Sequence, residues 1–191
     1  MDLPESPPAR KEPTNVAVTS MLASSSGWLF LSRRDFNDKG GDNPMKDALM
    51  ERLKIFLHRE DNSTLVGIPA SEEEIAKAQQ QLNVNFHEDY VHFIRTFGGA
   101  YAGLAVHAFS NGSSLGNETV VDLTLGFREQ FKELPFAEVL QSNYVISMDG
   151  SGDPIFINSA GKVFICYHDS GEIKLLADSF EDLIEDNFFE W

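Results

Sequence analysis

The sequence predicts an α+β domain that ends in an antiparallel β-meander. Two patterns predict it: apolar residues recur at helical spacing before residue 98, and four short β-rich segments separated by turn residues follow residue 143. Helices segregated before and after a run of strands are typical of the α+β class. With 191 residues, 42% of them hydrophobic, the chain can bury one ordinary core.

Three helices are predicted in the first half of the domain. The first spans residues 46–59. Its apolar stripe consists of Leu49, Leu53, Phe56 and Leu57. A second helix begins after Ser71, because a serine followed three residues later by Glu74 is the pattern of a capping box. A third places Tyr90, Phe93, Ile94 and Phe97 on one face. The glycine pair at 98–99 is expected to end it.

The second half of the domain contains the predicted sheet. Residues 101–109 are compatible with a strand, and residues 120–131 are predicted to form a fourth helix. The strands of the meander are expected at residues 144–148, 155–158, 162–167 and 172–176. A closing helix over residues 178–187 is expected to turn its apolar residues inward and its acids toward solvent.

The first 44 residues show no sustained periodicity and contain several prolines and a serine-glycine stretch. This composition predicts a disordered tail. A start assigned too far upstream is the alternative, because Met45 stands directly before the first helix. A signal peptide is a further alternative, because residues 16–31 are mildly apolar, although hydroxyl residues interrupt this run. The predicted organisation is therefore a tail over residues 1–44 and a single domain over residues 45–191.

The charge of the chain restricts its partners. Thirty acidic residues against 15 basic ones give a net charge of −15, and the first 44 residues hold six of those acids and five of those bases. The excess therefore belongs to the domain, where it repels nucleic acid and anionic membranes. We expect a basic protein or a small molecule as partner. A single cysteine and the lack of a long apolar stretch favour the cytoplasm.

Residues 148–157, MDGSGDPIFI, allow three interpretations: a metal loop, a catalytic pair or a turn. Asp149 and Asp153 stand at the first and fifth positions of the loop, as in a calcium site. However, Pro154 and Ala160 occupy the places where that pattern requires Gly and Glu. The β-formers after Pro154 favour a hairpin turn, and no metal or other cofactor is predicted.

Catalytic patterns are weak throughout. Cys166, His168 and Asp169 are close enough to suggest a cysteine nucleophile, but Cys166 falls in an apolar β-rich run and is predicted to pack as a small hydrophobic residue. The five histidines are scattered without an HExxH pair, and the glycines after Phe97 match no phosphate-binding loop. We therefore predict no catalytic residue and expect that the protein is not an enzyme.

Eight short segments together carry a resemblance. They are residues 68–75 (IPASEEEI), 82–84 (LNV), 90–94 (YVHFI), 97–99 (FGG), 152–157 (GDPIFI), 161–164 (GKVF), 167–169 (YHD) and 177–180 (ADSF). In this order and spacing they resemble the SUKH superfamily, the Smi/Knr-type proteins, over residues 45–188. The family pattern leaves the N-terminal tail unexplained.

The resemblance implies a mixed, mostly antiparallel sheet flanked by helices, and a structural turn at residues 152–153. It also implies a role in bacteria as an immunity protein that binds and blocks a cognate toxin, whereas fungal relatives act as regulatory scaffolds. Three functional hypotheses remain from the residues and the resemblance together. The first is neutralisation of a basic, nuclease-type toxin by occlusion, and the second is an intracellular scaffold or adaptor. The third is a hydrolase or metal enzyme built on Asp149 and Asp153 or on Cys166 and His168.

The expected partner surface consists of carboxylates on the closing helix and in two loops. They are Asp149, Asp169, Glu181, Asp182, Glu185 and Asp186. The four helix acids are expected to face solvent. Neutralising them together should therefore slow association with a basic partner about tenfold at low ionic strength and leave folding intact.

Overall fold

The structure is a computed structural model that describes residues 45–189. The predictions for residues 1–44 lie outside the described residues. Seven helical segments and six strands follow one another in residues 45–189. No helix among them is long and apolar enough to span a membrane.

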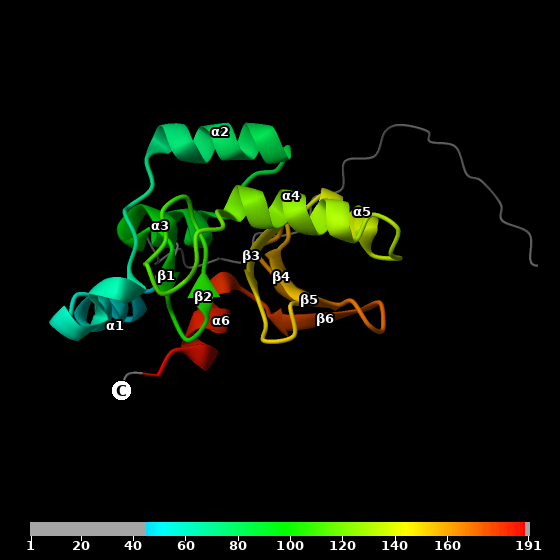
Figure 1. Ribbon diagram of the computed structural model, residues 1–191. Coiled ribbons are helices and arrows are strands. Elements are labelled where there is room, and N and C mark those ends of the chain that lie inside the picture. The colour runs from blue at the N-terminus through cyan, green and yellow to red at the C-terminus, as the bar shows by residue number, and fades with distance from the viewer. Residues whose placement is uncertain (1–44, 190–191) are drawn as a thin grey trace, which may run out of the picture. The chain divides into compact units, whose positions relative to one another are not determined.

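The helices agree with the predicted ones, with two additions (Figure 1). Their bounds are α1 Asp47–Leu57, η1 Glu60–Leu65, α2 Glu72–Leu82, α3 Glu88–Phe97, α4 Val120–Gln130, α5 Ala137–Gln141 and α6 Phe180–Asn187. The 3₁₀-helix η1 and the helix α5 were not predicted. They have six and five residues, which is too short for an apolar stripe to repeat.

The predicted meander is confirmed. Its strands are β3 Tyr144–Met148, β4 Pro154–Ile157, β5 Val163–Tyr167 and β6 Glu172–Ala177. They pair in the order β3-β4-β5-β6, and each pair is antiparallel. Within residues 45–189, parallel pairing is limited to an isolated bridge between Gly99 and Asn111. The α+β class is therefore confirmed, and its named strands are all paired in the antiparallel sense.

The single strand predicted over residues 101–109 is wrong. Two short strands, β1 Ala100–Tyr101 and β2 Ala105–Val106, form a separate hairpin there. Gly103 makes the turn with a φ of 85°, and a Cβ on it would lie 2.1 Å from the carbonyl oxygen of Asn187. Glycine is required at this turn because of both the backbone conformation and the close approach.

Two capping boxes set the starts of α2 and α4. In the predicted one, Ser71 Oγ accepts a hydrogen bond from the Glu74 amide at 3.2 Å, and Glu74 Oε2 accepts one from the Ser71 amide at 2.8 Å. The second pairs Thr119 with Asp122 in the same way. It was not predicted, because an aspartate stands where the usual pattern has Glu or Gln.

Strands β3, β4 and β5 are buried on both faces, so that two cores form, whereas most of β6 is exposed. Alternate residues of β3, such as Tyr144 and Ile146, point into the larger core, which also contains apolar residues of α1, α2, α3 and α6. Val145 points the other way, into a smaller core made by α4, α5, Phe156 and Cys166. Figure 1 shows α4 running across the strands on the side of this smaller core.

Candidate functional site

The turn between β3 and β4 is held by Asp149. Its Oδ1 accepts hydrogen bonds from the amides of Ser151, at 2.8 Å, and of Asp153, at 2.9 Å. Gly152 adopts a φ of 84°, which glycine tolerates without strain. The hairpin turn predicted for this loop is therefore confirmed, and both local amides depend on one carboxylate oxygen.

Asp153, at the end of the same turn, points into the protein. The residue is 5% exposed, and its Oδ1 accepts a hydrogen bond from the His168 amide at 2.9 Å. The same oxygen lies 2.5 Å from His168 Nδ1. The Asp153 carboxylate therefore accepts a backbone hydrogen bond from a residue in the turn between β5 and β6. It thereby ties the two turns together.

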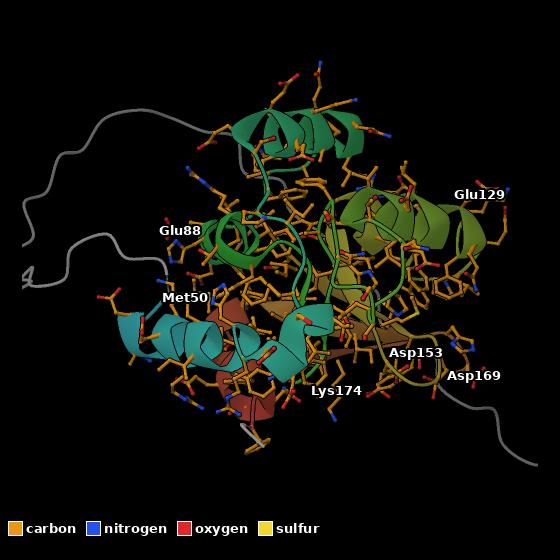
Figure 2. All side chains as sticks on the ribbon, turned by 60° about the vertical axis from the view of Figure 1, so that its left-hand side comes forward. Met50, Glu88, Glu129, Asp153, Asp169 and Lys174 are labelled. Carbon is orange, nitrogen blue, oxygen red and sulfur yellow. The ribbon has the colours of Figure 1, made fainter. Side chains whose placement is uncertain are left out.

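His168 lies among carboxylates. Its ring stacks on Phe131, with centroids 6.0 Å apart, and its Nε2 lies 3.1 Å from Asp169 Oδ1. The hydrogen bond to Asp153 raises the pKa of His168 above its usual value against the opposing effect of desolvation, and the charges of Asp169 and Asp149 raise it further. Figure 2 shows Asp153 and Asp169 at the same end of the sheet. This end is strongly negative.

Cys166 is fully buried in the smaller core, as predicted for a small hydrophobic residue. Burial, together with the negative charge of Asp153, raises the pKa of its thiol to about 11. A thiol with a raised pKa is protonated at neutral pH and is a poor nucleophile. Within residues 45–189, no three His, Cys, Asp or Glu side chains are placed to share a metal ion.

A groove of 360 Å³ runs between α4 and the β3–β4 turn. Its lining residues are Glu118, Asp122, Leu123, Gly126, Phe127, Gln130, Met148 and Gly152. We call it the α4–hairpin groove. It combines apolar side chains with two carboxylates, and no Lys or Arg lines it. Met148 is 39% exposed and also lines a second groove of 370 Å³ between the same turn and α6.

The basic residues near the C-terminal end of α4 are engaged away from the groove. Arg128 donates hydrogen bonds to the carbonyl oxygens of Leu82, Leu140 and Asn143, and its burial lowers its pKa. Lys132 Nζ lies 2.7 Å from Glu129 Oε1. The groove carboxylates therefore have no basic neighbour in the lining.

The acids of α6 are placed differently from the prediction. Glu181 Oε1 lies 2.8 Å from Lys46 Nζ, and the Glu181 side chain is only 13% exposed. Glu185 Oε2 lies 2.8 Å from Arg52 Nη1. The expectation that all four helix acids face solvent is wrong for Glu181, because an ion pair draws it against α1.

The remaining predicted partner residues fall into two groups. Asp182 lies in the first turn of α6 and contacts the N-cap residue: its amide donates to Ser179 Oγ at 3.0 Å, and Ser179 Oγ donates to Asp182 Oδ2 at 2.7 Å. Asp186 is exposed. Asp149 and Asp169 are brought together around His168, on a part of the surface that α6 does not supply.

Several candidate residues of the groove were not predicted from the sequence. Leu123 and Phe127 belong to the smaller core, so their apolar character predicts burial alone. Gly126 offers the one signal available, because a glycine inside a predicted helix usually has a packing or functional reason.

Together these features define an acidic α+β domain in which helices pack on both faces of the first three strands of an antiparallel meander. The sequence profile of the SMI1 / KNR4 family (SUKH-1) matches residues 69–186, which is more than half of the chain. The chain therefore belongs to the SMI1 / KNR4 family. A comparison with curated proteins gives no match.

Proposed function

We propose that the protein is an immunity protein that binds a cognate toxin in the cytoplasm and blocks it by occlusion. The toxin carries a basic active-site surface, as a nuclease does, and no catalytic step by this chain is needed. Membership of the SMI1 / KNR4 family supports the proposal, because the bacterial relatives that the sequence resembles have this role.

One observation carries the proposal: carboxylates without a basic neighbour in the lining lie beside the exposed side chain of Met148 at the β3–β4 turn. Glu118 and Asp122 line the groove, and Asp149 follows directly on Met148. Asp122 accepts hydrogen bonds from the hydroxyl and from the amide of Thr119. The hydroxyl has the larger effect, and both lower the pKa of Asp122 and keep it ionised. Such a surface attracts a basic protein over a distance and can then hold it by apolar contact.

The proposal predicts a rate effect that separates charge from stability. In the variant Glu118→Gln, Asp122→Asn, Asp149→Asn, each replacement removes a charge and keeps a side-chain oxygen as an acceptor. We expect association with the toxin to slow about tenfold at low ionic strength, and the difference to shrink as salt is added.

The measurement is association kinetics across a salt series, with a toxin encoded beside the gene as the ligand. A matched control is Glu60→Gln, Asp61→Asn, Glu88→Gln, which removes three exposed acids elsewhere. Equal rates for the two triple variants at low salt would exclude the groove as the docking surface. Cells that die from the toxin despite co-expression of the wild-type chain would refute neutralisation itself.

A further inference from the structure

Gly126 has no evident role inside the fold. It lies within α4, where a glycine destabilises a helix relative to alanine. A Cβ built on it meets no other atom within 4 Å, whereas a Cβ on Gly98 or Gly103 would collide with backbone atoms. The packing of the described chain therefore explains the glycines at 98 and 103 but not the one at 126.

Gly126 lines the α4–hairpin groove, so its lack of a side chain affects the space that a partner can enter. Leu123 and Phe127, its neighbours on α4, line the groove, and Met148 lines it from the end of β3. With no side chain at 126, a partner atom can approach the helix backbone between these apolar groups. A volume of 360 Å³ is near the lower end of the range for ligand pockets, about 300–1,000 Å³, which suits one anchoring side chain.

The charges around the groove favour particular residues on either side of the anchoring side chain in the partner. Glu118 and Asp122 line the groove, Asp149 follows Met148, and the lining contains no base. A flanking Lys or Arg would meet carboxylates, whereas a flanking Asp or Glu would be repelled.

We propose that the α4–hairpin groove receives a single large apolar side chain, flanked by Lys or Arg, from a projecting segment of a basic protein partner. Gly126 provides the clearance for this side chain. The identity of the partner as a toxin rests on the proposed function, but the specificity of the groove does not.

The specificity can be tested with defined peptides and the full-length, isotope-labelled protein. The probes are three capped pentapeptides: Lys-Lys-Trp-Lys-Lys, Lys-Lys-Ala-Lys-Lys and Glu-Glu-Trp-Glu-Glu. We expect the first to shift the amide resonances of Leu123, Gly126 and Phe127 saturably in NMR titrations. The alanine peptide should bind about tenfold more weakly, since the anchor is lost. The acidic peptide should cause no shift there.

Two variants test the clearance. Gly126→Trp fills the groove and should abolish the shifts at Leu123 and Phe127. Leu125→Trp adds the same bulk at the neighbouring exposed position of α4, which does not line the groove, and should leave them unchanged. Melting curves of both variants check that the fold is kept, and Gly126→Ala gives a smaller obstruction if the tryptophan unfolds the protein.

Two results would overturn the proposal. One is equal affinity for the tryptophan and alanine peptides, which would mean charge alone attracts them. The other is unchanged binding by Gly126→Trp. Because the titrations need no toxin, they decide the specificity of the groove even if neutralisation is absent, and in that case only the proposed function fails.

Discussion

The closing helix α6 and the α4–hairpin groove both concentrate negative charge, but they use it in opposite ways. On α6, Glu181 and Glu185 pair with Lys46 and Arg52 of the α1 region, and Asp182 is hydrogen-bonded to the N-cap residue Ser179. The groove has carboxylates and no base in its lining. The two regions therefore differ in where the counter-charges of their acids lie, and the density of acids along the sequence does not show this difference.

The contacts between α6 and α1 also involve apolar groups. Arg52 stands over the ring of Phe188, with its guanidinium carbon 5.6 Å from the ring centroid, and Phe56 meets the same ring edge to face at 5.2 Å. A partner that bound these helix acids would have to displace Lys46 and Arg52 from them. The acids of the groove need no such displacement.

The largest effect on stability is expected for Asp153, the carboxylate of the β3–β4 hairpin that points into the protein. Asp153→Ala should lower the free energy of unfolding by about 1.5–3 kcal/mol, because the His168 amide and ring lose a charged acceptor. Urea denaturation measures the loss. Asp169→Asn is the matched control at an exposed side chain and should change stability by less than about 0.5 kcal/mol. Equal losses in both variants would contradict the distinction between inward and outward acids of this region.

A gain in stability is expected on the groove side of the comparison. Gly126→Ala should raise the free energy of unfolding by about 0.5–1 kcal/mol, because the helix gains propensity and the new methyl group meets no atom of the protein. Urea denaturation of the wild type and the variant measures this gain. If the variant is less stable than the wild type, the position has a structural role and the contrast with α6 is weakened.

A smaller loss is expected on the side of α6. Glu181→Gln with Glu185→Gln should lower the melting temperature modestly, and more at low salt than at high salt, because two partly exposed ion pairs are removed. Asp186→Asn serves as the control on the same helix. The rate of association with a basic partner should stay close to that of the wild type. A tenfold slower association would show that the acids of α6, and not those of the groove alone, belong to the partner surface.

The smallest effect is a slope in the dependence of stability on pH. The pKa of His168 is raised in the folded state, so its stabilising contribution is complete below the unfolded value of about 6.5. The contribution is lost as the pH rises through the folded pKa. The free energy of unfolding of the wild type should therefore fall in this window relative to that of His168→Gln. Parallel profiles for the two proteins would show that His168 does not couple the two turns through its charge.

The elements that the sequence predicts well are those with a repeating local pattern. The apolar stripe of α1 and the β-rich runs of the meander each repeat several times, so burial on one face determines them. The segment over residues 101–109 has no such repeat, and the turn at Gly103 depends on the approach of Asn187 from the end of the chain. A contact of that separation leaves no local trace in the sequence.

The same reason explains which parts of the site were predicted. The Asp149 turn depends on neighbours within four residues, and it was predicted. Glu181 meets Lys46, which stands 135 residues earlier, and this contact was not predicted. The groove unites residues of α4 with Met148 and Gly152. Its acidic and apolar members come together only once the chain is folded.

The burial of the chain's single cysteine makes its thiol a probe of local opening of the smaller core. Cys166 lies in the smaller core without exposed surface, so a thiol-specific reagent can reach it only in molecules whose smaller core has opened. The labelling rate therefore reports how often α4 and the sheet separate. Because the α4–hairpin groove stands on that interface, a ligand seated in it should lengthen the interval between openings.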